Sequence, residues 1–190
     1  MLCVKKIYIL LTRTQSTVSK IVHFFTKDSY THASIAFDRE FYQLFSSTRK
    51  NGRTMFPAGP SREYLDRGFF ARYGKTPCAV LEYEVEDEVY EKTFAEVMDI
   101  IDHKDEYKFN AWGLITCKLG FPLYRKNKFF CSQFVAEMLT RHTTAVLPNE
   151  PAMTRPADYL TVPEFKKIFE GDIKDLSAFC RDGQKETVVL

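Results

Sequence analysis

The residue of this sequence best suited to chemistry is Cys131, because it stands at the predicted start of a helix. Apolar residues recur at helical spacing through residues 129–139, and the cysteine falls in the first turn. Unpaired backbone N–H groups and the helix dipole stabilise a thiolate there, and they can also hold the oxyanion formed when a thiolate attacks a carbonyl. Cys131 is therefore a candidate nucleophile. The alternative is that it is a small core residue, because Phe134, Val135 and Met138 share its stripe of the helix.

A cysteine nucleophile needs a base, and His32 is the histidine best placed to serve. It begins a run in which residues 32, 34 and 36 alternate with 33, 35 and 37, a pattern typical of a strand. A Cys131/His32 pair can therefore be proposed from two separated segments. The remaining histidines, His23, His103 and His142, have mostly polar neighbours and are predicted to lie at the surface.

A third polar residue that orients the imidazole is sought in the hairpin that follows His32. The chain turns at residues 38–40 and runs back through residues 41–47. If the turn centres on Arg39, Ser46 lies opposite His32 on the same sheet face, whereas a shift of one residue brings Ser47 there. Ser46 is thus the candidate orienting residue, although a serine cannot stabilise an imidazolium by charge.

Composition indicates one globular domain over residues 1–190, since 45% of the residues are hydrophobic and 15% are aromatic. The net charge of +2 does not indicate a nucleic-acid partner. The five cysteines are widely spaced and form no C-x-x-C pair, which fits neither a disulfide framework nor a structural zinc site. No run is apolar enough for a transmembrane segment and no signal peptide is recognised, so we expect a reducing cytoplasm.

The elements that must position the two residues follow from the hydrophobic pattern. The first expected elements are a strand over residues 4–12 and a helix capped by residues 14–17 and running to Phe25. After the hairpin, residues 48–76 are rich in Arg, Lys, Gly and Pro, and they are interpreted as a long connection that could cover a cleft. The later expected elements are a strand over 78–85, a helix over 86–107, a more buried helix over 110–119, the cysteine helix, and a last strand or short helix over 165–173.

The chain resembles the circularly permuted branch of the papain-like NlpC/P60 superfamily, in which the histidine strand precedes the cysteine helix. The resemblance rests on residues 31–35 and 130–135, with weaker support from residues 12–14, 45–50 and 156–159. It implies an α+β fold with a central antiparallel sheet and the cysteine helix packed on it. It also implies cysteine-dependent hydrolysis or transfer at an amide, ester or thioester bond, with Cys131 and His32 as the catalytic pair.

Such chemistry needs no metal or organic cofactor. The motif variants resemble bacterial ones, while the sequence identifies neither the substrate, which could be a peptide, a lipid or another acyl compound, nor the oligomeric state. The alternative function is a binding protein that kept the fold and lost turnover, for which the weak orienting serine and the long connection would be the signs.

Overall fold

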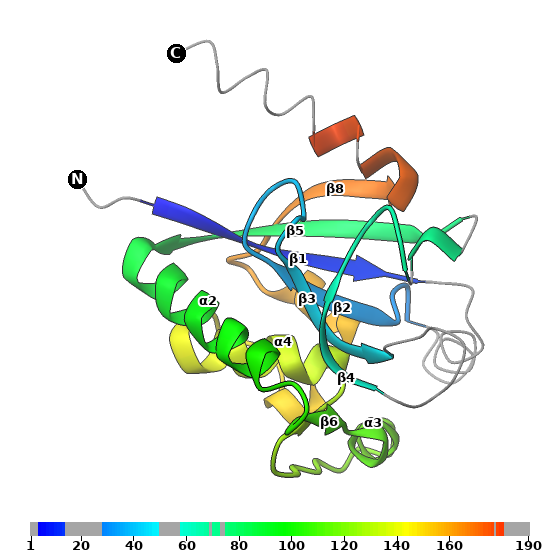
Figure 1. The fold of residues 1–190 in the computed structure, drawn as a ribbon, viewed down its shortest axis with the longest axis vertical. Coiled ribbons are helices and arrows are strands. Elements are labelled where there is room, and N and C mark those ends of the chain that lie inside the picture. Colours follow the sequence, from blue (N-terminus) through cyan, green and yellow to red (C-terminus); the bar gives the residue numbers. More distant parts are fainter. Residues whose placement is uncertain are drawn as a thin grey trace.

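The apolar runs of the sequence form the strands of one antiparallel sheet in the computed structural model of the protein (Figure 1). The structure describes residues 4–13, 28–49, 58–68, 70–72, 75–176 and 178–180. The predicted helix over residues 14–25, together with His23 and Cys3, lies outside these residues. The six-stranded sheet has the order β4-β3-β2-β1-β5-β8. Its strands are β1 (Val4–Thr12), β2 (His32–Ala36), β3 (Leu44–Arg49), β4 (Ala58–Glu63), β5 (Pro77–Glu86) and β8 (Lys166–Asp172).

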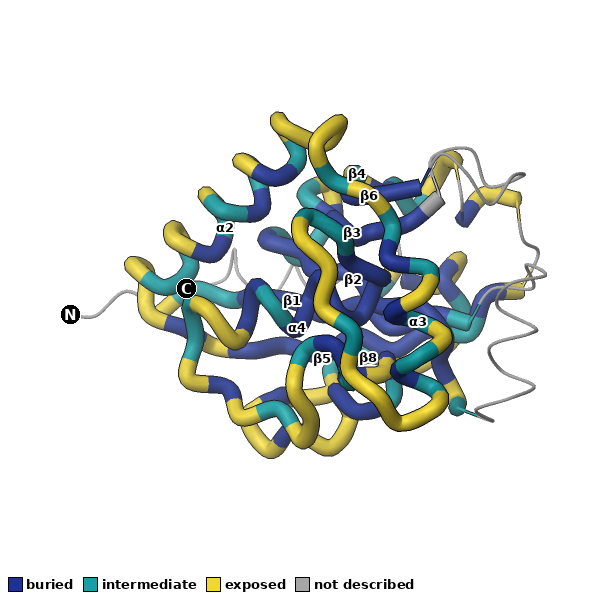
Figure 2. Tube along the Cα trace, turned by 90° about the horizontal axis from the view of Figure 1, so that it is seen from below, coloured by how far each residue is buried: buried dark blue, intermediate teal, exposed yellow. Residues whose placement is uncertain are grey.

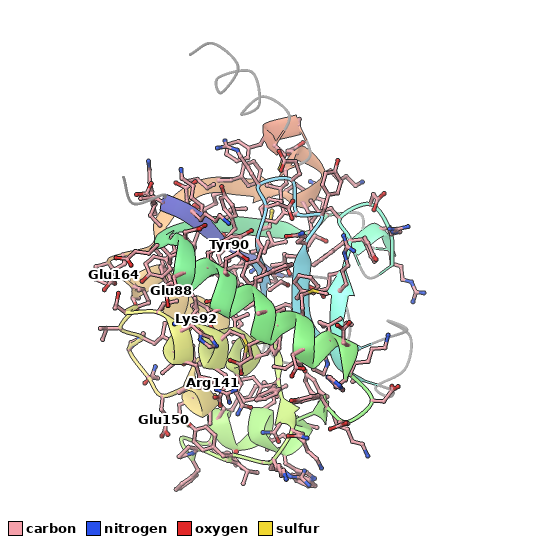
Figure 3. The ribbon with its side chains drawn as sticks, turned by 60° about the vertical axis from the view of Figure 1, so that its left-hand side comes forward. Glu88, Tyr90, Lys92, Arg141, Glu150 and Glu164 are labelled. Carbon is pink, nitrogen blue, oxygen red and sulfur yellow. The ribbon has the colours of Figure 1, made fainter. Side chains whose placement is uncertain are left out.

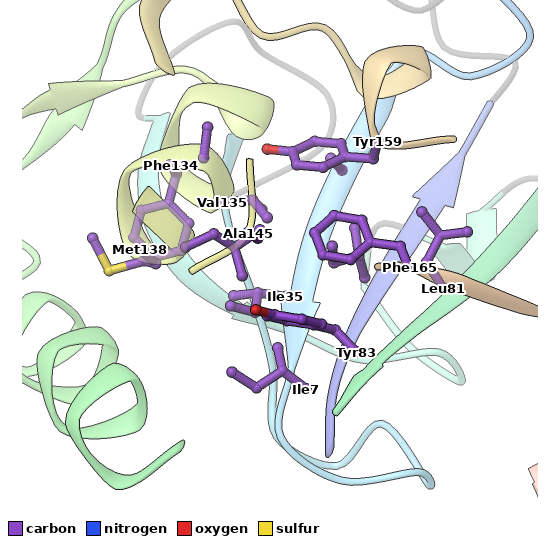
Figure 4. Packing of buried hydrophobic residues seen from close by; sticks show 14 of the residues in the cluster. Ile7, Ile35, Leu81, Tyr83, Phe134, Val135, Met138, Ala145, Tyr159 and Phe165 are labelled. Atoms are coloured by element: carbon purple, nitrogen blue, oxygen red, sulfur yellow. The ribbon is translucent and has the colours of Figure 1, made fainter. Parts of the chain in front are cut away.

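Two helices cover one face of this sheet. Helix α4 (Cys131–His142) packs on β2 and β3, and α2 (Asp87–Asp102) packs against α4 and β1. The larger core cluster lies between these helices and the sheet, and in it Ile35, Leu81 and Phe134 are fully or almost fully buried (Figure 4). Arg141 of α4, labelled in Figure 3, joins the two helices through an ion pair with Glu96 of α2, and it also pairs with Glu137 of its own helix.

The other face of the sheet is covered by Phe70 and by the residues that follow β8. Phe70 belongs to the 3-10 helix η1 (Phe70–Arg72), and Ile173, Leu176 and Cys180 complete the second core cluster. Both faces of the central strands are therefore buried, and the sheet appears mainly dark blue in Figure 2. The molecule is thus a mixed α+β fold with a central antiparallel sheet, as expected.

A smaller unit precedes α4 in the chain. Strand β6 (Lys108–Phe109) pairs in parallel with β7 (Lys128–Phe129), and α3 (Ala111–Lys118) lies between them in sequence. The 3-10 helices η2 (Pro151–Met153) and η3 (Pro156–Thr161) follow α4. The predicted strands over 4–12 and 78–85 and the predicted helices over 86–107 and 110–119 are confirmed in type, although α2 ends at Asp102.

Two predictions about the segments after His32 are wrong. A turn centred on Arg39 would pair Ile35 with Gln43, but the structure pairs Ile35 with Phe45. The loop is wider because the Asp38 carboxylate accepts the backbone N–H of Tyr42 and Gln43, and Phe41 takes a left-handed conformation with φ 59°. The predicted connection over 48–76 contains β4 and η1, since an edge strand tolerates Gly59 and Pro60.

Candidate active site

The first turn of α4 offers open backbone N–H groups to the Cys131 side chain. Phe130 is the N-cap residue, with φ −91° and ψ 170°, and its side chain makes no capping hydrogen bond. Because an apolar N-cap supplies no acceptor, the first-turn N–H groups remain for other partners. The N–H groups of Ser132 and Ala33 form hydrogen bonds with the Cys131 sulfur. The sequence places the cysteine at this helix start, and the structure supplies an anion-stabilising site around it.

Cys131 and His32 are hydrogen-bonded to each other, and each shifts the pKa of the other. Burial lowers the pKa of His32, but the charge of Glu63 and hydrogen bonds with Cys131 and Glu63 outweigh it and raise the pKa to about 10. Burial raises the pKa of the Cys131 thiol, but the bond to His32 and its positive charge outweigh burial and lower it from 9.0. The histidine is therefore the more basic partner, and the pair favours thiolate and imidazolium.

The residue that orients the imidazole is Glu63, at the end of β4. His32 Nε2 lies 3.0 Å from Glu63 Oε1 and 3.2 Å from Oε2. Ser34, two residues along β2, donates to Glu63 Oε2 at 2.5 Å and lies 3.2 Å from Nε2. Because these groups occupy Nε2, the bond to Cys131 is assigned to Nδ1. The side chain of Glu63 is 3% exposed, so its interaction with His32 is little screened by water.

Ser46 makes no hydrogen bond with the ring of His32, so the prediction that it orients the imidazole is corrected. Its hydroxyl donates to the carbonyl of Ala33 at 2.7 Å, a bond that ties β3 to β2. Ser47 faces α4 instead and donates to the carbonyl of Phe129 at 2.7 Å. The shifted hairpin register accounts for both positions. Of the three predicted site residues, the structure brings Cys131 and His32 together and gives Ser46 a structural bond.

Sequence reasoning missed Glu63 because β4 carries no strand signal. The six residues of β4 are Ala, Gly, Pro, Ser, Arg and Glu, a composition that indicates a loop. Pairing of β4 with β3 then places Glu63 opposite Leu44, on the sheet face shared with Ala36. The only usable signal was chemical, since an imidazole beside a thiolate calls for a carboxylate within reach.

Two buried side chains hold the first turn of α4 in place. The Tyr159 hydroxyl donates to the Ser132 carbonyl at 2.7 Å, and the ring points its hydroxyl toward the helix in Figure 4. Asn110 donates from Nδ2 to Gln133 Oε1 at 3.2 Å and accepts the N–H of Gly113 at 3.0 Å as the N-cap of α3. The position of Cys131 is thus fixed from η3 on one side and from α3 on the other.

The other described cysteines differ sharply from Cys131. Burial raises the pKa of Cys78 to about 12 and that of Cys117 and Cys180 to about 11. All three are buried. Among the cysteines that the structure describes, Cys131 is therefore the one with a stabilised thiolate.

Elsewhere in the described chain, His103 and His142 pair with Asp99 and Glu96 on α2, His103 exposed and His142 half-buried. The described residues contain no group of three or more His, Cys, Asp or Glu side chains that could hold a metal ion. None of their helices combines the length and the hydropathy of a bilayer span.

Comparisons with known proteins give no relative for this chain. No protein-family model matches the sequence, and neither the curated proteins nor the solved structures provide a match. The function is therefore argued from the geometry of Cys131, His32 and Glu63.

Proposed function

We propose that the protein is a cysteine-dependent hydrolase or acyltransferase with the permuted papain-like arrangement of the NlpC/P60 superfamily. The observation that carries the proposal is the line of contacts from the Cys131 thiol through the His32 ring to the Glu63 carboxylate. The order along the chain, with histidine on an inner strand and cysteine at the start of a later helix packed on that strand, also supports it.

In the proposed reaction, the Cys131 thiolate attacks the carbonyl carbon of an amide, ester or thioester. The new S–C bond forms as the carbonyl oxygen becomes an oxyanion, which the open N–H groups of the α4 first turn stabilise. His32 gives its proton to the leaving group as the bond to that group breaks. Water or an acyl acceptor then attacks the acyl-enzyme, His32 takes its proton, and Cys131 is released.

The contact between Glu63 and His32 supports an active enzyme over the alternative of a binding protein that has lost turnover. A carboxylate on Nε2 fixes the ring orientation and stabilises the imidazolium that forms beside the thiolate. One of the two signs of an inactive binding protein was a serine as the orienting group, and Ser46 donates to the Ala33 carbonyl instead of to the ring. Cys131 and His32 each keep 8% of their surface exposed, which leaves the pair accessible at its margin.

Alkylation followed by mass spectrometry of the cysteine peptides tests this proposal. We expect iodoacetamide to label Cys131 first near neutral pH, at a rate that falls strongly in His32→Ala. Cys180 is the internal control, because burial raises its pKa to about 11. A panel of amide, ester and thioester substrates, assayed with wild type and Cys131→Ser, then identifies the bond. Equal labelling of Cys131 and Cys180, or turnover that survives Cys131→Ser, would overturn the proposal.

A further inference from the structure

The most unusual surface of the molecule is apolar and lies on α3 and the loop after it. Five large side chains in this region keep between 48% and 67% of their surface exposed: Trp112, Ile115, Leu119, Phe121 and Tyr124. We call them the α3 patch. The sequence had predicted a more buried helix here, and that prediction holds only for the face with Gly113 and Cys117. Exposed apolar patches are a typical feature of interaction surfaces.

The backbone conformation of α3 and of the turn after it places the side chains of this patch at the surface. Residues 112, 115 and 119 follow the spacing of one helix face. At the end of α3, the N–H of Gly120 bonds to the Cys117 carbonyl at 3.2 Å and the N–H of Phe121 bonds to that of Thr116 at 2.9 Å. Gly120 has φ 82°, so this pair of bonds forms a Schellman motif that ends the helix. The motif fixes Phe121 beside the exposed helix end.

The segment of the chain that carries the patch has charged side chains of a single sign. Residues 107–128 contain no Asp or Glu, although they hold five of the 27 basic residues of a chain that has 25 acidic ones. These five are Lys108, Lys118, Arg125, Lys126 and Lys128. The net charge of +2 for the whole chain conceals this concentration.

A cavity of about 530 Å³ joins the basic residues to the patch. The cavity is lined by four basic residues, by the carboxylate residue Asp105 and by Trp112 of the patch. The basic residues are Lys104, Lys108, Arg125 and Lys128. None of these four cations forms an ion pair with another described residue. Several cations with no ion-pair partner among the described residues thus lie beside exposed apolar side chains, which fits a ligand that is anionic at one end and apolar at the other.

We propose that the α3 patch and this cavity dock the protein on an anionic phospholipid bilayer. Lipid phosphate groups would meet Lys108, Arg125 and Lys128, while Leu119 and Phe121 would enter the acyl boundary and Trp112 would lie at the interface. The aliphatic side chains Ile115 and Leu119 favour acyl chains over nucleic-acid bases, which stack on aromatic rings. Along the chain, the segment that would contact the membrane is followed by β7 and then by Cys131 at the start of α4.

The single tryptophan of the chain makes the proposal directly testable, because Trp112 belongs to the patch. Full-length protein is mixed with vesicles of phosphatidylcholine alone or of equal parts phosphatidylcholine and phosphatidylglycerol. We expect co-sedimentation, a blue shift of the tryptophan emission and protection from a soluble quencher with the anionic vesicles alone. The assay involves no turnover, and Cys131→Ser should bind like wild type, so its outcome is independent of the proposed function.

Matched variants assign the binding to the patch. Arg125→Ala with Lys128→Ala should weaken binding about 25-fold, since each basic residue near a membrane contributes roughly fivefold. Lys166→Ala with Lys174→Ala removes the same charge from β8 and the segment that follows it, and should change binding little; β8 lies at the opposite end of the molecule from α3 (Figure 1). Leu119→Ser with Phe121→Ser should abolish the blue shift, whereas Val146→Ser, a single exposed apolar residue elsewhere, should not.

Four outcomes would overturn the proposal. The first is equal binding to neutral and anionic vesicles, and the second is equal weakening by the β8 and patch charge variants. The third is tighter binding to a single-stranded oligonucleotide than to anionic vesicles, which would assign the surface to nucleic acid. The fourth is a stable dimer in light scattering that Leu119→Ser with Phe121→Ser dissociates, since the patch would then be covered by a second copy.

Discussion

At the scale of single residues, the reactivity of Cys131 depends on one carboxylate that lies far from it in the chain. Glu63 supplies the largest of the effects that raise the pKa of His32, and His32 in turn lowers the pKa of the thiol. The two steps are coupled because the same ring contacts both groups. A change at Glu63 should therefore be visible at a sulfur atom that it does not touch.

Glu63→Gln should slow alkylation of Cys131. The amide keeps the size of the side chain but removes the charge, so the pKa of His32 falls and the pKa of the thiol rises. At a pH below the thiol pKa, each unit of rise lowers the thiolate fraction and the labelling rate about tenfold. The pH profile of iodoacetamide labelling measures this shift.

Ser46→Ala is the control for that variant. Because the Ser46 hydroxyl bonds to the Ala33 carbonyl, its loss should lower the free energy of unfolding by about 1 kcal/mol and leave the labelling profile in place. A profile shifted by Ser46→Ala and unchanged by Glu63→Gln would restore the serine as the orienting group.

At the scale of elements, α3 begins around a contact that admits no larger residue. A Cβ atom at Gly113 would lie 2.1 Å from Nδ2 of Asn110, the residue that caps α3 and contacts Gln133 on α4. The glycine is therefore required by the cap, although Gly is a poor helix former. The cap connects the helix of the exposed patch to the helix of the nucleophile.

Gly113→Ala should destabilise the protein, although alanine favours helix formation by about 1 kcal/mol over glycine. The methyl group must displace Asn110, which breaks hydrogen bonds of a fully buried side chain and costs about 2 to 3 kcal/mol. Urea unfolding of the single and double variants measures this in a cycle with Asn110→Ala. In the Asn110→Ala background the penalty of Gly113→Ala should vanish, and an additive result would exclude the clash as its cause.

The sequence specified most elements but not their register. Continuous apolar runs gave β1 and β5, and helical spacing gave α2 and α4, because these patterns reflect local burial. The hairpin register depended on the Asp38 carboxylate and the left-handed Phe41, which the turn sequence did not reveal. Strand β4 could not be recognised because its residues gain their conformation from pairing with β3, and Glu63 was missed with it.

At the scale of the whole molecule, the Cys131/His32 pair should flatten the pH dependence of stability. The raised pKa of His32 stabilises the fold fully below pH 6.5, and this contribution is lost as the pH rises through about 10. The lowered pKa of Cys131 stabilises it above pH 9.0, and this contribution is lost as the pH falls through the folded value. Above both pH 6.5 and the folded pKa of Cys131, and up to about pH 9, the two changes cancel, because the folded and unfolded pairs each hold one proton.

We therefore expect the free energy of unfolding contributed by the pair to be level in this range and to fall on both sides of it. Urea unfolding across pH, for wild type and for His32→Gln with Cys131→Ser, gives this contribution as the difference between the two curves. A difference that changes steadily up to pH 9, with no level part, would mean that only one of the two pKa values is shifted.

The place of Glu63 on β4 has one further consequence. Strand β4 is one of the two edge strands of the six-stranded sheet and pairs within it only with β3, so it can detach while the inner strands and both large helices stay folded. Such local opening costs less free energy than global unfolding, and hydrogen exchange detects it. Each opening would carry the carboxylate away from His32 and leave the cysteine in place but unactivated. The fraction of active molecules would then be set by the local opening of an edge strand, at temperatures and denaturant concentrations below those that unfold the core.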